Sequence, residues 1–221
     1  MYSREDYDQL KAHCHRWCPD PRTIIIGGGG AYHTGTSRRM YPDADIYCFE
    51  PASARLSTLQ AFTDAMSVQM VQTALGDVNG YKQLQLTKLG VCNSLFSSQP
   101  GPFEHLQGFV GVETVSVTRL DDWCTLAHVD PATIGYIYLD IQGAELMALK
   151  GSPVVLQHAR LVVLEVAFKP MYKDAPLHED IDLFMRATGF TCAMHTRATI
   201  APDVYGDAWY IRRDGEQCVK M

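Results

Sequence analysis

The sequence lacks long apolar runs and a surplus of positive charge, and each lack excludes a class of protein. Its longest apolar runs, residues 23–26 and 161–166, fall far short of the roughly 20 residues that span a bilayer. Its 19 Lys and Arg stand against 25 Asp and Glu, which gives a net charge of −6. Nucleic-acid-binding proteins usually carry a basic surplus. We therefore expect neither a membrane protein nor a nucleic-acid binder.

Internal repeats, low-complexity tracts and linkers are also missing from the 221 residues. The chain is 47% hydrophobic and 20% charged, a composition typical of globular proteins rather than disordered or fibrous ones. A chain of this length can bury about 70% of its unfolded surface, so its core needs no covalent staples. We predict an N-terminal helical segment over residues 1–20 and a single domain over residues 21–221.

The cysteines form no recognisable disulfide framework. The seven are odd in number and scattered: Cys14, Cys18, Cys48, Cys92, Cys124, Cys192 and Cys218. The first residues, MYSREDYDQLKAH, carry both charges and no apolar core of a secretory signal. We expect reduced, mostly buried thiols in a cytoplasmic protein. His13 and His15 add metal-ligand types near Cys14 and Cys18, but one Cys-x₃-Cys without a second pair is a poor zinc motif.

Short apolar runs alternate with helical patterns, which predicts an α/β protein with a mostly parallel sheet. The expected strands cover residues 23–26, 45–49, 69–73, 134–140 and 160–166, and the expected helices cover residues 32–40, 144–150 and 178–188. Two last strands, residues 190–195 and 208–213, are expected to form a hairpin. Half-buried strands at 81–87 and 113–118 flank a long loop. Asp121–Trp123 predicts a capped helix start with a packed tryptophan.

A glycine-rich turn follows the first predicted strand. It consists of Gly27, Gly28, Gly29 and Gly30. Glycines let the backbone approach a ligand and adopt positive φ, so such a turn before a helix suits a phosphate or nucleoside. Glu50, followed by Pro51, ends the next strand about twenty residues later, where a carboxylate can accept hydrogen bonds from both ribose hydroxyls. These features predict an adenosine-containing cofactor, with a ligand-free tight turn as the simpler alternative.

Two cofactors fit this outline, NAD and S-adenosylmethionine. The dinucleotide fingerprint G-x-G-x-x-G requires a third glycine. Tyr32 and His33 occupy the two positions where that glycine would fall. S-adenosylmethionine has no pyrophosphate and does not need it, so the sequence favours a methyl donor.

A second site lies in the segment LDIQGAELMALKG. Asp140 ends an apolar strand at the edge where open α/β sheets bind ligands. It could hold the methionine ammonium, receive a substrate proton or bind a cation; the simpler alternative is that it caps the next helix. Glu145, in the first turn of that helix, is interpreted as structural.

Several motifs, taken in order, resemble the FkbM family of S-adenosylmethionine-dependent O-methyltransferases. They are IYCFEPASARLSTLQ, VQTALGDVNG, VSVTRLDDW, IGYIYLDIQGAELMALKG and LVVLEV, followed by a late helix and AWYIRR. The resemblance covers about residues 22–213. It implies a class I, Rossmann-like methyltransferase fold: a seven-stranded, mostly parallel sheet with a reversed last strand and helices on both faces. It also implies methylation of a hydroxyl, often on a sugar or secondary metabolite.

The same resemblance assigns roles to individual residues. The glycine turn would wrap the methionine end of the cofactor, Glu50 would hold the ribose, and Ala74 and Leu75 would lie by the adenine. Asp140 would face the reacting centre as the catalytic residue.

The sequence departs from the family pattern at three places. The Asp that usually ends the first strand is Ile25 or Ile26, and the Asn of the turn is a glycine. The usual Glu after Asp140 is Gln142, which removes one charge.

Further residues extend this hypothesis. Asp140 and Glu165 end adjacent strands and could together hold Mg²⁺ or Mn²⁺. His33 is a candidate base because it follows the glycine turn, and Asn93 lies in the long loop that could close over the cofactor. The aromatic residues proposed to line an acceptor pocket are Phe168, Tyr172, Tyr205 and Trp209.

The sequence thus predicts an O-methyltransferase that acts on a small-molecule or glycan acceptor. Two alternatives stay open: an NAD-dependent oxidoreductase, and a methyltransferase-like binding module without chemistry.

Overall fold

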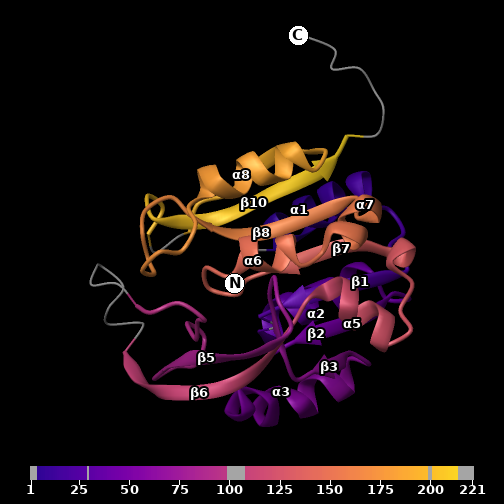
Figure 1. The fold of residues 1–221 in the computed structure, drawn as a ribbon. Coiled ribbons are helices and arrows are strands. Elements are labelled where there is room, and N and C mark those ends of the chain that lie inside the picture. Colours follow the sequence, from indigo (N-terminus) through magenta and orange to yellow (C-terminus); the bar gives the residue numbers. More distant parts are fainter. Residues whose placement is uncertain (1–3, 29, 99–107, 199–200, 214–221) are drawn as a thin grey trace.

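The computed structural model of the chain describes residues 4–28, 30–98, 108–198 and 201–213 (Figure 1). Among these residues, no helix is both long and apolar enough to cross a membrane.

A seven-stranded sheet forms the centre of the molecule. Its strands, in spatial order, are β3 (Gln69–Val71), β2 (Asp45–Phe49), β1 (Thr23–Gly27), β7 (Ile134–Leu139), β8 (Leu161–Ala167), β10 (Tyr205–Arg212) and β9 (Phe190–His195). The pairs are parallel except that β10 runs antiparallel to both β8 and β9. The α/β class, the final hairpin and the reversed last strand are therefore confirmed.

Helices cover both faces of this sheet (Figure 1). They are α1 (Arg4–Trp17), α2 (Ala31–Met40), α3 (Ser53–Ala65), α5 (Leu120–Leu126), α6 (Glu145–Lys150), α7 (Pro153–His158) and α8 (His178–Ala187). Side chains alternate between faces along a strand, so neighbours in β1 enter different cores. Ile25 packs in the cluster that includes residues of α5–α8, whereas Ile24 and Ile26 pack in the cluster with α1 and α2.

A smaller sheet stands beside the central one and carries part of the site. It has the order β4 (Ala74–Leu75), β6 (Phe109–Thr118), β5 (Gly80–Thr87). Strand β6 begins four residues before the predicted start at 113. The chain after β5 folds back on it through a bridge between Gln85 and Ser94. Residues 99–107 of the predicted long loop lie outside the described residues.

The segment around Asp121 corrects one expectation. Its carboxylate accepts hydrogen bonds from the backbone N–H groups of Val154 (2.9 Å) and Val155 (3.0 Å). Asp121 therefore caps α7, a helix that the sequence pattern did not predict, instead of its own helix α5. Trp123 does pack as predicted, with its ring edge-on to Phe49 at a centroid distance of 4.9 Å.

The cysteines of the described residues are free, and those near the N-terminus lie in the core. Burial raises the pKa of both Cys14 and Cys18 to about 12, which keeps their thiols protonated. His15 Nε2 donates a hydrogen bond to the Met40 carbonyl oxygen at the end of α2, at 3.0 Å. This N-terminal cluster is thus a packing contact between α1 and α2.

Candidate active site

Three strands end together and place three chemically distinct residues at one edge of the sheet. Gly27 is paired in register with both Phe49 and Leu139. Gly28, Glu50 and Asp140 each follow one of these aligned residues, so they meet at the carboxyl edge, where open α/β sheets bind ligands.

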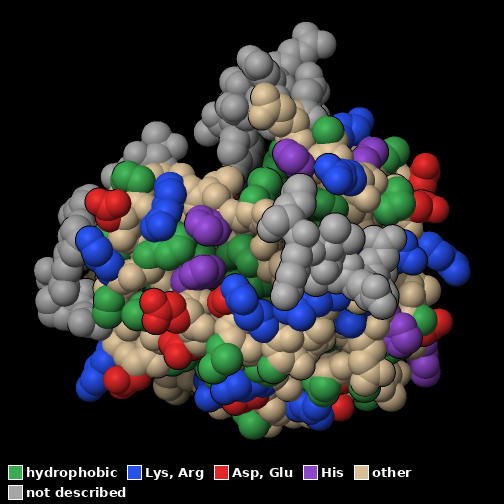
Figure 2. Space-filling view, turned by 90° about the horizontal axis from the view of Figure 1, so that it is seen from above, with side chains coloured by type: hydrophobic (Ala, Val, Ile, Leu, Met, Phe, Trp, Pro, Cys, Tyr) green, Lys and Arg blue, Asp and Glu red, His purple; other side chains and the backbone are tan. Residues whose placement is uncertain are grey.

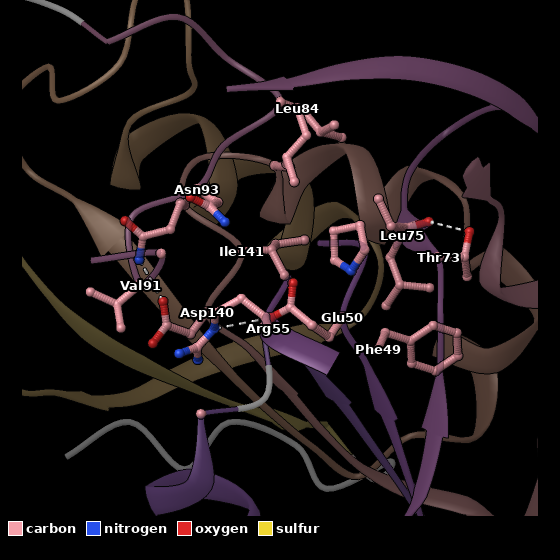
Figure 3. A pocket seen from close by; sticks show the side chains of 18 of the residues that line it. Phe49, Glu50, Arg55, Thr73, Leu75, Leu84, Val91, Asn93, Asp140 and Ile141 are labelled. Atoms are coloured by element: carbon pink, nitrogen blue, oxygen red, sulfur yellow. Dashed lines mark hydrogen bonds and ion pairs between the residues drawn. The ribbon is translucent and has the colours of Figure 1, made fainter. Parts of the chain in front are cut away.

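A cavity of about 250 Å³ opens at this edge, and we call it the central cavity. Figure 3 shows Glu50 and Arg55 in the middle of the view, with Asp140 on one side and Phe49 and Leu75 on the other. Its walls include residues of the glycine turn, the ends of β2 and β7, and the small sheet: Gly28, Gly30, Glu50, Ala74, Leu75 and Asp140. Residues predicted separately from the sequence therefore surround one space.

The glycine turn approaches the end of β7 too closely for any side chain. Gly28 has φ of +73°, and a Cβ there would lie 1.7 Å from the carbonyl oxygen of Asp140. Gly28 and Gly30 line the central cavity. Gly27 instead closes β1, where a Cβ would lie 2.8 Å from the side chain of Leu139. Gly29 lies outside the described residues.

Glu50 presents a buried carboxylate to the central cavity. Only 6% of the residue is exposed. One oxygen accepts a hydrogen bond from the Ala52 N–H at 2.9 Å, and the other lies 3.8 Å from Nε of Arg55. Burial raises the pKa of Glu50, while the Ala52 hydrogen bond and the Arg55 charge lower it. The carboxylate keeps acceptor capacity for a ligand with hydroxyl groups.

The wall beside Glu50 is apolar. Pro51, Ala74, Leu75 and Leu84 line it, and Phe49 lies at its base. Ala74 and Leu75 are 6% and 2% exposed, so their side chains form a well-packed apolar surface. A flat, largely apolar ring system matches such a wall, because contact there removes apolar area from water.

Asp140 does not cap the helix that follows it. Helix α6 begins at Glu145 without a side-chain cap. The two carboxylate oxygens of Glu145 accept from the backbone N–H groups of Ile141 (2.8 Å) and Gly143 (3.0 Å), in the loop before the helix. Burial raises the pKa of Glu145 to about 8. The helix-cap alternative for Asp140 is therefore wrong, and Asp140 remains available to the central cavity that it lines.

Gln142 connects four parts of the site. Its Nε2 donates to Asp140 Oδ1 and to Glu165 Oε2, both at 2.7 Å. Its Oε1 accepts from the Tyr172 hydroxyl at 2.5 Å, and its carbonyl oxygen accepts from Ser94 Oγ at 2.6 Å. The backbone adopts φ of +56°, an uncommon value outside glycine that is frequent at functional sites. From the sequence, Gln142 was noted only because it replaces the usual Glu and removes one charge; its bridging role was not predicted.

Asp140 and Glu165, the two proposed metal ligands, do lie close together, but both are hydrogen-bonded to the same side-chain amide. The Gln142 amide donates to both Asp140 and Glu165, so an N–H group points at each carboxylate where a cation would bind. Across the parts of the chain that the structure describes, no three His, Cys, Asp or Glu side chains gather in a metal-binding group. The described residues therefore do not build the expected Mg²⁺ or Mn²⁺ site.

The Gln142 amide that bridges Asp140 and Glu165 should contribute to stability at neutral pH. Gln142→Glu would replace an N–H donor by a third carboxylate beside Asp140 and Glu165. We expect the free energy of unfolding at neutral pH to fall by about 1–3 kcal/mol, since the partly buried carboxyl groups of Asp140 and Glu165 both lose a hydrogen-bond donor. Urea denaturation measures it, with the exposed Gln83→Glu as the matched control at about ±0.5 kcal/mol.

The sign of the pH dependence follows from the like charges. They raise the pKa of the introduced carboxyl in the folded state above its unfolded value, so the loss should grow as pH rises and fade in acid. Unchanged stability at neutral pH would contradict the bridging role.

His33 lines the central cavity from α2. Its ring stacks on Tyr138 of β7, with centroids 4.3 Å apart and an interplanar angle of 22°. Its Nε2 lies 3.1 Å from the Tyr138 hydroxyl and 3.9 Å from Asp140 Oδ2. The candidate base therefore lies beside the candidate catalytic carboxylate.

The chain after β5 closes one side of the central cavity. Gly90, Val91, Asn93 and Leu95 all line it. The Asn93 side chain is fixed because its Oδ1 accepts from the Thr87 N–H at 2.8 Å. Asn93 was expected here from the sequence. Arg55, Gly90, Val91 and Leu95 were not, because loop residues and a single partly buried helix position carry no periodic signal.

None of the four aromatic residues predicted to line an acceptor pocket is among the described residues that line the central cavity. Trp209 is 3% exposed and packs against Trp17 in the core, so its proposed role was wrong. Tyr172 is 4% exposed and holds Gln142 instead of facing open space. Phe168 carries the Arg197 guanidinium 3.6 Å from its ring centroid.

The strand order and the central cavity together define a class I, S-adenosylmethionine-dependent methyltransferase. The chain belongs to the FkbM methyltransferase family, because the model of the methyltransferase FkbM domain matches residues 30–192. It is 29% identical over 178 residues to the 2-O-methyltransferase NoeI of Sinorhizobium fredii. The aligned region covers 75% of this chain and 71% of that protein.

Solved structures show the same fold at low sequence identity. A candidate O-methyltransferase from Klebsiella pneumoniae has a TM-score of 0.55 at 13% identity, covering 96% of this chain and 82% of its own. The magnesium protoporphyrin IX methyltransferase of Synechocystis PCC 6803, with bound S-adenosylmethionine, has a TM-score of 0.51 at 12% identity, covering 95% and 79%.

Proposed function

We propose that the protein transfers the methyl group of S-adenosylmethionine to a hydroxyl oxygen of a sugar, glycan or other small polar acceptor. The observation that carries the proposal is the single central cavity, which joins Glu50 at one end to Asp140 and His33 at the other. The similarity to a 2-O-methyltransferase supports oxygen as the methyl acceptor.

The residues of the central cavity fit the cofactor. Glu50 would accept hydrogen bonds from the ribose hydroxyls, and the wall of Ala74 and Leu75 would hold the adenine ring. Gly28 leaves room beside Asp140 that any Cβ would fill, which suits the methionine end. When bound, the cofactor supplies a methyl group on a positively charged sulfur.

Asp140 would act at the reacting end. Gln142 fixes one of its oxygens at 2.7 Å, which leaves the other toward His33 at 3.9 Å. A carboxylate held in this way puts negative charge at the reacting end and helps to place the acceptor oxygen for in-line attack.

The surface supports a small or neutral acceptor over a nucleic acid. The net charge is −6, and Figure 2 shows Lys and Arg interspersed with Asp and Glu on one face. Free, protonated thiols suit a reducing compartment such as the cytoplasm.

The experiment is a methyl-transfer assay on purified protein. S-adenosylmethionine labelled in its methyl group is incubated with neutral oligosaccharides, amino sugars, phenols and RNA, and S-adenosylhomocysteine is quantified. We expect product with a carbohydrate, and NMR should place the label on an oxygen. Transfer only to nitrogen, or only to RNA, would refute the proposal.

A further inference from the structure

The imidazole of His33 is held at the reacting end of the central cavity by Tyr138 of β7 and by Asp140, the residue that follows β7. Tyr138 provides a stacked ring at 4.3 Å and a hydroxyl 3.1 Å from Nε2. Asp140 provides a carboxylate oxygen 3.9 Å from the same nitrogen. The opposite nitrogen, Nδ1, has no hydrogen-bond partner within the described ranges, and the ring lines the cavity.

We propose that His33 is the base that takes the proton of the acceptor hydroxyl, and that Asp140 is its charge partner. This inference rests on the proposed function and adds the residue that receives the proton. It follows from Nε2 facing a carboxylate while Nδ1 is free, since a carboxylate favours hydrogen on the nearer nitrogen and leaves the lone pair on the other.

The step balances with groups already named. The acceptor O–H bond breaks and its proton passes to Nδ1 of His33, while the new C–O bond forms as the methyl–sulfur bond breaks. The S-adenosylhomocysteine formed is neutral at sulfur, and the positive charge now rests on the imidazolium. Asp140 offsets that charge, and the proton then leaves to solvent, to which the His33 side chain is 27% exposed.

The environment of the ring favours the neutral form before reaction. The groups that face it are Tyr32 of its own helix, Tyr138 of β7, and Asp140 just after β7. Burial lowers the pKa of His33, and the Asp140 charge raises it in part. Burial also keeps Tyr138 protonated, because it raises the pKa of that hydroxyl well above its usual range. At neutral pH the imidazole is therefore ready to accept a proton.

The decisive variant is His33→Gln, whose amide nitrogen can still donate to Tyr138 and Asp140 but cannot take up a proton. We expect the methyl-transfer rate to fall by about 10²–10⁴-fold. The dissociation constant for S-adenosylmethionine, from calorimetry, should stay within about threefold. His158→Gln, at the exposed end of α7, is the matched control and should keep the wild-type rate.

The pH profile separates a base from a structural residue. The wild-type rate should fall in acid, at a pH below the ordinary histidine range, because burial lowers the pKa at which His33 becomes protonated. That limb should be missing in His33→Gln, and added imidazole should restore part of the rate.

The outcomes distinguish the two proposals. A wild-type protein that methylates no hydroxyl would refute the proposed function and this inference with it. If the wild-type protein is active and His33→Gln keeps a near-normal rate and the same fall in acid, only the assignment of His33 as the base would be refuted. A variant that loses activity because it no longer binds the cofactor would also overturn it.

Discussion

Asp140→Asn should lower turnover by about 10²–10⁴-fold while the melting temperature changes little. Asparagine keeps the shape of the side chain, and its oxygen can still accept from the Gln142 amide that now lies 2.7 Å away. It removes the negative charge 3.9 Å from His33 Nε2, so an imidazolium formed during transfer would have no charge partner. Steady-state methyl transfer and thermal unfolding measure the two effects.

The matched control for this variant is Asp45→Asn. Asp45 is exposed at the amino end of β2, on the edge of the sheet opposite the central cavity, so its charge should not affect the reaction. A near-normal rate for Asp140→Asn would refute the catalytic role. Loss of activity through unfolding would make Asp140 a structural residue, and loss of wild-type activity in EDTA would assign it to a metal.

Glu50→Ala should weaken S-adenosylmethionine binding by about ten- to a hundred-fold. The expected cause is the loss of hydrogen bonds to a charged acceptor, which contribute roughly 1.5–3 kcal/mol. The variant also removes the ionic partner of Arg55, 3.8 Å away. Isothermal titration calorimetry measures the affinity directly, without an identified acceptor.

A second variant separates the ribose contact from a change in the cavity. Glu50→Gln keeps the side-chain volume and one oxygen for the Ala52 N–H, so its affinity should fall between wild type and Glu50→Ala. Unchanged affinity in both variants would show that Glu50 does not hold the cofactor.

Most of the central sheet could be predicted because its signals are local. The runs at 23–26, 45–49 and 161–166 are largely apolar, and β1, β2 and β8 lie there. The first two runs are followed directly by a glycine and by an acid. Parallel strands end at one edge, so Gly28, Glu50 and Asp140 could be expected to meet.

Other elements escaped prediction because partners distant in sequence stabilise them. Helix α7 begins where Asp121, more than thirty positions earlier in the chain, accepts hydrogen bonds from its first N–H groups. Strand β6 extends to Phe109 because β5 pairs with it, although the sequence there alternates weakly.

The sequence by itself determined the order of strands and helices, the glycine turn and the two acids at strand ends, because each depends on neighbouring residues. Only the tertiary structure decided which side chains share a proton or a hydrogen bond. His33 meets Tyr138 across 105 positions, and Ser94 meets Gln142 across 48. Such contacts depend on how α2, the segment after β5 and the loop after β7 pack against one edge, and no local pattern encodes that packing.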